Sequence, residues 1–181
     1  MLNREDTLLV VVDVQGKLAQ VVHESEAMLQ TLVKLIQGAN ILGLPVVWLE
    51  QYPEGLGPTV EEVARLLRGV GAAPIAKRTF NACDDPAFLA AVRQTGRRQV
   101  LLSGIEAHIC VYQTAVGLTA QGYEVQVVVD AVSSRTAANK QIGIEKMKMG
   151  GVAITSLETA LYELLRVAEG EAFKQILQLV K

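Results

Sequence analysis

Three side chains suited to covalent catalysis follow apolar runs at separate points of the sequence. Asp13 follows TLLVVV, Lys77 closes PIAK, and Cys110 lies in the octapeptide GIEAHICV (104–111). A thiolate is a nucleophile, a carboxylate can accept the thiol proton, and a nearby ammonium stabilises the thiolate. Taken singly, each residue also fits a structural role, as a capping Asp, a surface Lys or a small buried Cys. Together they indicate a thiol-based catalytic site.

The octapeptide could form a metal site, a local catalytic cluster or a site with a single working residue, because it places Glu106, His108 and Cys110 within five positions. Cys110 falls in the first turn of a predicted helix, where free N–H groups and the helix dipole favour a thiolate of lowered pKa. The other histidine, His23, does not form an H-x-x-x-H pair with His108, so a His-rich metal site is unsupported.

Composition limits the classes of function. The chain has 181 residues, half of them hydrophobic, which predicts one domain with a substantial core. A net charge of −2 with mixed signs argues against a nucleic-acid partner. No apolar stretch reaches the roughly 18 residues of a membrane span, and the polar start MLNREDT is not a signal peptide. We therefore expect a cytoplasmic protein with reduced thiols.

Short apolar runs alternate with helical patterns along the chain. The strands are predicted at 7–13, 45–50, 74–77, 99–104, 123–130 and 151–155. The helices are predicted at 27–42, 60–70, 85–96, 108–122, 135–150, 156–168 and 171–181, with a loop at 51–59. This alternation predicts one α/β domain over residues 1–181, with a doubly wound, mainly parallel sheet and helices on both faces.

Doubly wound sheets bind ligands beyond the carboxyl ends of their strands. The residues predicted at those ends are Asp13, Glu50, Lys77, the 104–110 turn and Asp130. Motifs for dinucleotides (G-x-G-x-x-G), for P-loop phosphates and for a serine nucleophile elbow (G-x-S-x-G) are absent from the sequence. The thiol site is thus the catalytic hypothesis that remains.

Four segments carry a resemblance to a known family: VVVDVQGKL (10–18), AKRTFNAC (76–83), GIEAHICVYQTA (104–115) and VVVDAVSSRT (127–136). Over nearly its whole length the chain resembles the isochorismatase-like cysteine hydrolase superfamily. The segment LEQYPEGLGPTV (49–60), with GIEAHIC, is most similar to the isochorismatase domain-containing subgroup. The resemblance implies a Rossmann-like three-layer fold.

The resemblance also implies roles for individual residues. It implies an Asp13–Lys77–Cys110 triad, a non-proline cis peptide at Ile105–Glu106, and an oxyanion hole formed by the backbone N–H groups of Glu106 and Cys110. The implied reaction is attack on a carbonyl or related carbon, a thioester-type intermediate, then hydrolysis. The motif match implies that Gln15 and Phe80 lie near the triad. We expect Ile105 and Tyr52 to complete the substrate pocket, although a packing role is equally open for Tyr52 as a loop residue.

The sequence departs from the family's pattern where nicotinamidase-like members bind a metal. After the second strand it has Glu50, Gln51, Tyr52 and Pro53, without histidine, so we expect neither a metal nor another cofactor. Isochorismatases proper lack the cysteine, so the resemblance does not name the substrate. Glu106 either lines the pocket, favouring a polar or cationic substrate group, or makes a surface or subunit contact.

The remaining predictions concern assembly and the competing function. Phe173, Ile176, Leu177 and Val180 form an apolar stripe, and helix 171–180 closes its own core or meets a neighbouring subunit of a homo-oligomer. Cys83 is predicted to be structural. The main hypothesis is a cysteine hydrolase of a small amide or related C–N or ester substrate, and the alternative is a binding module that kept the fold without turnover.

Overall fold

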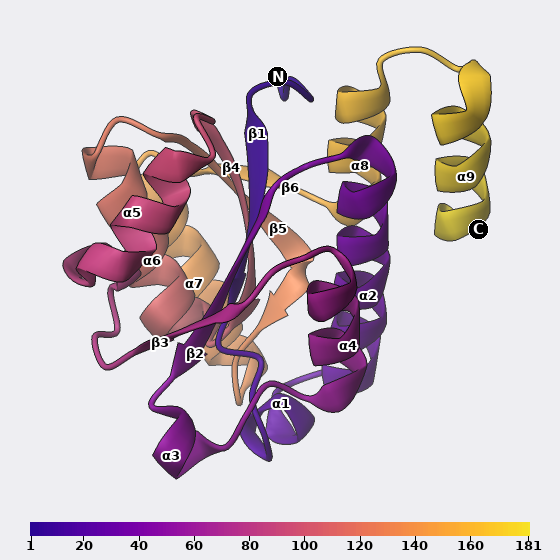
Figure 1. The fold of residues 1–181 in the computed structure, drawn as a ribbon. Coiled ribbons are helices and arrows are strands. Elements are labelled where there is room, and N and C mark those ends of the chain that lie inside the picture. The colour runs from indigo at the N-terminus through magenta and orange to yellow at the C-terminus, as the bar shows by residue number, and fades with distance from the viewer.

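Six parallel strands form the centre of the computed structural model, which describes residues 1–181 (Figure 1). They lie in the order β3-β2-β1-β4-β5-β6. Their bounds are β1 Thr7–Val12, β2 Val46–Gln51, β3 Pro74–Lys77, β4 Gln99–Ile105, β5 Glu124–Ser133 and β6 Ala153–Thr155. The prediction of a doubly wound, three-layer α/β fold is confirmed.

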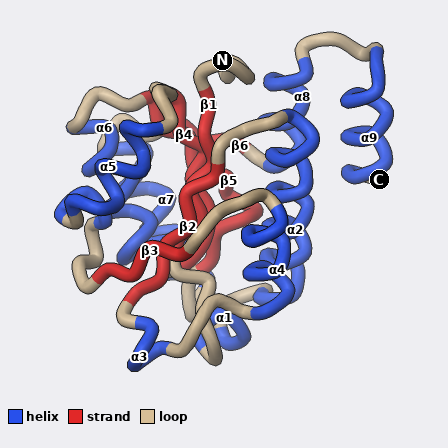
Figure 2. Tube along the Cα trace, in the orientation of Figure 1, coloured by secondary structure: helices blue, strands red, loops and turns tan.

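Helices cover both faces of the sheet (Figures 1 and 2). One layer consists of α2 Ser25–Leu42, α4 Glu61–Gly69, α8 Leu157–Leu165 and α9 Gly170–Val180, and the other of α5 Pro86–Gln94, α6 Tyr112–Ala120 and α7 Ala137–Met149. Successive side chains of a strand point to opposite faces. Leu9 and Val11 of β1 therefore join the core under α2, whereas Leu8 and Val10 join the core under α6. This double burial explains the continuous apolar run of β1.

The order of the strands creates a reversal beside β1. The chain passes outward from β1 to β2 and β3, then crosses to the opposite side of β1 to form β4. Ligands of such sheets bind outside the carboxyl ends of the strands at this switch point. Two short helices lie at that end, which is the lower end in Figure 1: α1 Leu18–Val21 and α3 Pro53–Leu56. The short elements η1 Ala82–Asp84 and η2 Ala107–Val111 follow β3 and β4 along the chain.

Two elements differ from the prediction at this edge. Residues 51–59 are not simply a loop, since Gln51 ends β2 and residues Pro53–Leu56 form the short helix α3. β5 runs to Ser133 rather than ending at 130, past a register shift opposite Leu102 and Gly104. An irregularity of this kind leaves the extra residues of β5 unpaired and bends the strand.

The longer β5 changes the position of Asp130. The residue lies within the strand, and its Oδ1 accepts a hydrogen bond of 2.9 Å from the backbone N–H of Leu157 at the start of α8. Asp130 is therefore a cap for α8 and not a member of the strand-end cluster. The N-cap of α7 is Thr136, whose hydroxyl accepts from the backbone N–H of Asn139 at 3.1 Å.

The C-terminal helix α9 packs against α2 and α8 of its own chain. Ile176 is fully buried in the core, and Val180 is partly buried against it, while Phe173 and Leu177 keep part of their surface exposed. Ile176 and Val180 of the predicted stripe therefore pack on the core of their own chain, and a role of the helix at a subunit interface stays a prediction. None of the helices is both long and apolar enough to cross a membrane.

Candidate active site

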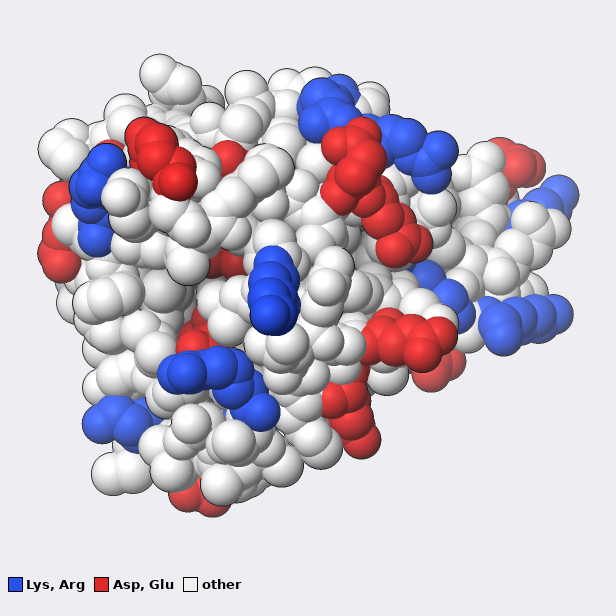
Figure 3. Space-filling model, turned by 90° about the horizontal axis from the view of Figure 1, so that it is seen from below, with Lys and Arg blue, Asp and Glu red and all other residues white.

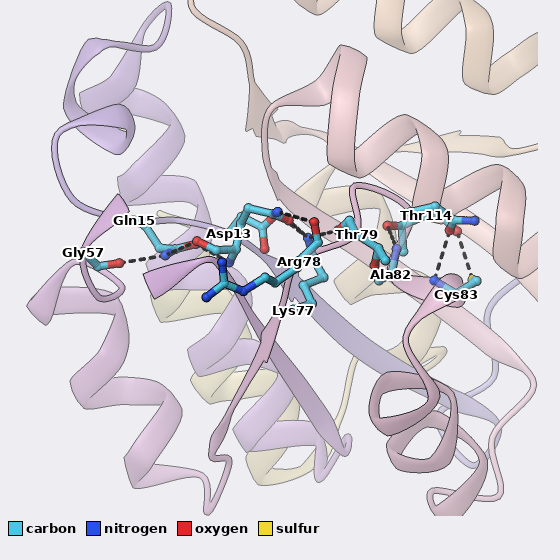
Figure 4. A network of polar contacts seen from close by, with 11 residues as sticks. Asp13, Gln15, Gly57, Lys77, Arg78, Thr79, Ala82, Cys83 and Thr114 are labelled. Atoms are coloured by element: carbon cyan, nitrogen blue, oxygen red, sulfur yellow. Dashed lines mark hydrogen bonds and ion pairs between the residues drawn. The ribbon is translucent and has the colours of Figure 1, made fainter. Parts of the chain in front are cut away.

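Asp13 and Lys77 meet at the carboxyl edge of the sheet (Figure 4). Asp13 follows β1 and Lys77 ends β3, with β2 between them. The Lys77 side chain reaches across β2 to Asp13. Its Nζ donates to Asp13 Oδ2 at 2.8 Å, to Gln51 Oε1 at 2.6 Å and to the Thr79 carbonyl oxygen at 3.2 Å. Both side chains of the ion pair are buried. Parallel topology thus assembles the pair from distant segments.

The backbone at Asp13 turns sharply as the strand ends. Its φ is 53°, in the left-handed region that Asp and Asn tolerate better than most residues. Its N–H donates to the Leu49 carbonyl at 3.2 Å, and its carbonyl accepts from Gln15 N–H at 2.9 Å. Asp13 Oδ1 is buried and has no hydrogen-bond partner. One carboxylate oxygen is therefore held by Lys77, and the other is free to accept a proton.

Gln15 ties the loop after β2 to the site. Its amide accepts from the Gln51 backbone N–H at 2.6 Å and donates to the carbonyl oxygens of Gln51 at 3.0 Å and Gly57 at 2.7 Å. The side chain is completely buried. Gln15 therefore positions the polypeptide around Lys77, since Gln51 is one of the three acceptors of that ammonium.

A second buried link holds the far end of the same loop. Glu50 Oε1 accepts from the backbone N–H and the hydroxyl of Thr59, both at 2.7 Å, and the Thr59 hydroxyl accepts from Trp48 Nε1 at 2.8 Å. Glu50 is buried with only these neutral donors on Oε1. This strand-end acid thus anchors the loop, and its charge raises the pKa of Asp13 slightly further.

Cys110 lies on η2, a turn of π-helix that links β4 to α6. The peptide bond between Ile105 and Glu106 is cis. The Glu106 carbonyl accepts from the backbone N–H groups of Ile109 at 3.0 Å and Val111 at 3.2 Å, whereas the Glu106 N–H has no acceptor within the chain. Helix α7 packs closely on this turn, because a Cβ at Gly143 would lie 2.5 Å from the Ala107 carbonyl group.

The electrostatics of the thiol differ from the expectation. Burial, and then the charge of Asp13, raise the pKa of Cys110 to about 12, and the Lys77 charge offsets only part of this. The expectation of a lowered thiol pKa at the helix start is therefore wrong for the free protein, because desolvation outweighs the helix N-terminus. Burial also raises the pKa of Asp13, against the opposing effect of Lys77. In the free protein Cys110 is therefore a neutral thiol, and the neighbouring Asp13 carboxylate has an increased proton affinity.

A cavity of about 100 Å³ opens onto these groups. Its lining residues are Asp13, Leu18, Gln51, Leu56, Phe80, Ile105, Glu106, Ile109 and Cys110. Phe80 and Ile105, both predicted at the pocket, are among them. Gln15 and Tyr52 are not: Gln15 is buried in the loop network, and the exposed Tyr52 ring lies 4.2 Å from the Arg78 guanidinium.

Glu106 turns its side chain toward the segment after β5. Glu106 Oε2 accepts from the backbone N–H of Arg135 at 2.8 Å, and Arg135 Nε lies 3.2 Å from both carboxylate oxygens. Glu106 is buried, and its ion-pair partner is largely exposed. His108 Nδ1 shares a 3.0 Å hydrogen bond with the Ser134 hydroxyl. These two side chains of GIEAHICV therefore brace the turn against the end of β5.

Cys83 occupies a separate place. Its Sγ lies 3.8 Å from the Thr114 carbonyl oxygen, and Figure 4 shows these two residues apart from Asp13 and Lys77. Burial, with a contribution from the Asp84 charge, raises the pKa of Cys83 to about 11. The hydrogen bond of the thiol goes to a backbone carbonyl and not to an acid or an imidazole, so the structural role predicted for Cys83 fits its surroundings.

Sequence reasoning missed four lining residues: Gln51, Leu18, Leu56 and Ile109. Gln51 was detectable, because it ends a strand at the same edge as Asp13 and Lys77. The three apolar residues carry no such signal in the sequence. No group of three or more His, Cys, Asp and Glu side chains is arranged to hold a metal ion.

Comparisons with solved structures extend the fold match over nearly the whole chain. The MAR1 ribonuclease of Caenorhabditis elegans superposes with a TM-score of 0.92 at 33% identity, covering 99% of this chain and 91% of that one. YcaC of Escherichia coli, described as an octameric hydrolase of unknown specificity, gives 0.92 at 24% identity, covering 98% and 89%. YcaC of Pseudomonas aeruginosa, solved with hexane-2,5-diol and covalent acrylamide, gives 0.91 at 25% identity, covering 98% and 90%.

Sequence comparisons identify the family. Isochorismatase domain-containing protein 1 of Danio rerio is 40% identical over 149 residues, which cover 82% of this chain and 51% of the relative, so the chain spans about half the length of that relative. Isochorismatase domain-containing protein 2 of Danio rerio is 32% identical over 179 residues, covering 99% and 89%. The model of the isochorismatase domain matches residues 7–159. The chain therefore belongs to the isochorismatase family, as the motifs of its sequence predicted.

Proposed function

We propose that this protein is a cysteine hydrolase of a small amide or a related C–N or ester substrate. The observation that carries the proposal is the arrangement around Asp13. One of its oxygens is held by Lys77, and the other is buried without a partner in the wall of a cavity that Cys110 also lines. A fixed base beside a thiol is what attack by a neutral thiol requires.

In the first half of the proposed reaction, Asp13 takes the thiol proton as Cys110 Sγ forms a bond to the substrate carbonyl carbon. The negative charge moves to the carbonyl oxygen, where the N–H groups of Glu106 and Cys110 stabilise it. The C–N bond then breaks, and the proton on Asp13 passes to the departing amine. The product of this half is a thioester on Cys110 and a free amine.

In the second half, water attacks the thioester carbonyl carbon and gives its proton to Asp13. The carbon–sulfur bond breaks, the carboxylic acid leaves, and the Cys110 thiolate recovers the proton held by Asp13. Lys77 keeps its charge throughout. Its role is to orient the Asp13 carboxylate and to offset the negative charge that develops on sulfur.

Features of the relatives support a small substrate and an assembled protein. The YcaC structure with covalent acrylamide holds a small amide, and the small cavity of this chain suits ligands of that size. Three structural relatives are called MAR1 ribonucleases, two of them as putative. The present chain, however, has a net charge of −2, and the face at the carboxyl edge carries both signs interspersed (Figure 3). We also propose a homo-oligomer, by analogy with the octameric YcaC.

The test of the proposal is covalent capture followed by turnover. Intact-mass analysis should show iodoacetamide adding to Cys110 well before Cys83 near neutral pH, with Cys83→Ser as the control that keeps the active thiol. Cys110→Ala and Asp13→Asn should each abolish hydrolysis of any amide or ester in a panel that the wild type cleaves. Hydrolysis retained by Cys110→Ala would eliminate covalent catalysis. A silent panel with slow labelling at both thiols would favour the binding module instead.

A further inference from the structure

The cavity beside Cys110 carries negative groups and no positive group of its own. Two of its nine lining residues, Asp13 and Glu106, are carboxylates, and none is Lys, Arg or His. A substrate that bears a carboxylate would therefore approach the buried, unpartnered Oδ1 of Asp13 in a small space, near the Glu106 carboxylate, whose ion-pair partner is the largely exposed Arg135. Like charges in such a poorly solvated site repel more strongly than they do in water.

The nearest cation cannot bind an anionic substrate. An ammonium has three N–H donors. Lys77 has three acceptors already, namely Asp13 Oδ2, Gln51 Oε1 and the Thr79 carbonyl oxygen, and its side chain is completely buried. To reach a substrate carboxylate, Lys77 would have to release one of them.

The other charges near the site do not reverse this balance. Arg135 approaches Glu106 through its backbone N–H and Nε, and it is not among the residues that line the cavity. Arg78 is exposed at the surface, paired with Glu54 and stacked on Tyr52. Glu50, just behind the site, accepts from Thr59 and has no cationic partner.

Apart from Gln51 and Cys110, the remaining walls of the cavity are apolar. Leu18, Leu56, Phe80, Ile105 and Ile109 supply them. Phe80 and Leu56 are also strongly exposed, with 56% and 41% of their surface accessible, so the apolar lining extends to the molecular surface. The volume of about 100 Å³ is far below the roughly 300 Å³ at which drug-sized ligand pockets begin. Only a substrate with a short apolar group fits the enclosed part.

Building on the proposed function, we infer that the substrate is an uncharged carboxamide or ester with a short apolar group, and that substrates bearing a carboxylate are rejected. The carbonyl end lies against Cys110 and the Glu106 N–H, and the apolar group lies against Leu56 and Phe80. Anionic substrates are then rejected because the Glu106 and Asp13 carboxylates repel them. The Lys77 ammonium cannot compensate, because its three N–H donors are already used by acceptors of the protein.

Two matched pairs of probes test the inference. Iodoacetamide and iodoacetate are similar in size and differ in charge, and 2-mercaptoethanol gives their intrinsic rate ratio toward a free thiol. At Cys110 the preference for iodoacetamide should exceed that reference by at least about tenfold, which corresponds to roughly 1.4 kcal/mol. In turnover, 3-methylbutanamide should be cleaved and malonamate, in which a carboxylate replaces the isopropyl group, should not.

Glu106→Gln identifies the origin of the selection. This change keeps an oxygen acceptor for Arg135 but removes the charge, so the iodoacetamide preference at Cys110 should fall toward the 2-mercaptoethanol ratio. Glu54→Gln, which removes an exposed acid near the mouth, is the matched control and should leave the preference unchanged. The inference would be overturned if wild-type Cys110 showed the same iodoacetamide preference as 2-mercaptoethanol, or if malonamate were cleaved. Either result would leave the proposed cysteine hydrolase function intact. A Cys110 inert to both probes would refute the hydrolase itself.

Discussion

Lys77 Nζ lies 2.8 Å from Asp13 Oδ2, and the two residues, 64 positions apart in the chain, form a buried ion pair at the edge of the sheet. A buried charge without its partner is costly, whereas an apolar pair of similar shape is not. The pair therefore contributes more to holding one carboxylate oxygen in place than to stability. That constraint leaves Asp13 Oδ1 directed away from Lys77 and unpartnered.

Lys77→Met should lower the free energy of unfolding by about 3–5 kcal/mol, because it leaves Asp13 buried without its counter-charge. Adding Asp13→Asn should recover much of that loss without restoring turnover. Chemical denaturation of the two single variants and the double variant measures the coupling. Arg68→Met, which breaks an exposed pair with Glu61, is the control and should cost less than about 1 kcal/mol. Additive losses would show that the buried charges act independently.

The pH dependence of Cys110 alkylation should follow Asp13 and not the thiol. Burial raises the pKa of Asp13 above 3.8 and that of Cys110 to about 12. Asp13 must be ionised to accept a proton, so the rate should rise as pH increases through the raised Asp13 pKa and then level off above it. In Asp13→Asn the rate should instead climb about tenfold per pH unit, as for an unassisted thiol. Timed labelling with iodoacetamide at a series of pH values gives the dependence of the rate on pH. If the wild-type rate shows no plateau, Asp13 does not assist as a base.

Gly143→Ala should reduce both stability and activity. Its Cβ would lie 2.5 Å from the Ala107 carbonyl group and 2.6 Å from the His108 nitrogen, so α7 or the turn carrying Cys110 must move. Overpacking of this kind costs about 1–3 kcal/mol. Gly69→Ala, also at a helical position but with nothing within 4 Å, is the control and should be neutral or slightly stabilising. Thermal melts and hydrolysis rates distinguish the pair, and equal behaviour would mean that the close approach is unimportant.

Gln15→Leu should disrupt the loop that carries Leu56. The change leaves the Gln51 N–H and the Gly57 carbonyl without partners, at a cost of about 1–3 kcal/mol for each buried group. Gln51 would then hold Lys77 less firmly, so turnover should fall even where the protein remains folded. Gln30→Leu, on the exposed face of α2, provides the comparison. Unchanged turnover in folded Gln15→Leu would separate this network from catalysis.

Much of the site was accessible from the sequence, because parallel strands place their ends at one edge. Continuous apolar runs located the ends at Asp13 and Lys77, and a Cys-containing turn after a third such run completed the set. The same rule gave a wrong position for Asp130, because it was applied to a strand expected to end at residue 130. Nothing in that segment of the sequence signals the register shift, after which β5 continues to Ser133.

The sequence by itself determined the layer architecture and the strand ends that carry the proposed triad, because periodicity is a local property. Its motifs determined the family. Tertiary structure decided how these groups behave. Burial reversed the expected direction of the Cys110 pKa shift, and packing engaged every N–H of Lys77 while leaving Asp13 Oδ1 open. It also directed Glu106 toward Arg135 and formed the cavity from apolar residues of several elements. Desolvation and hydrogen-bond occupancy depend on neighbours distant in the chain, so no local pattern encodes them.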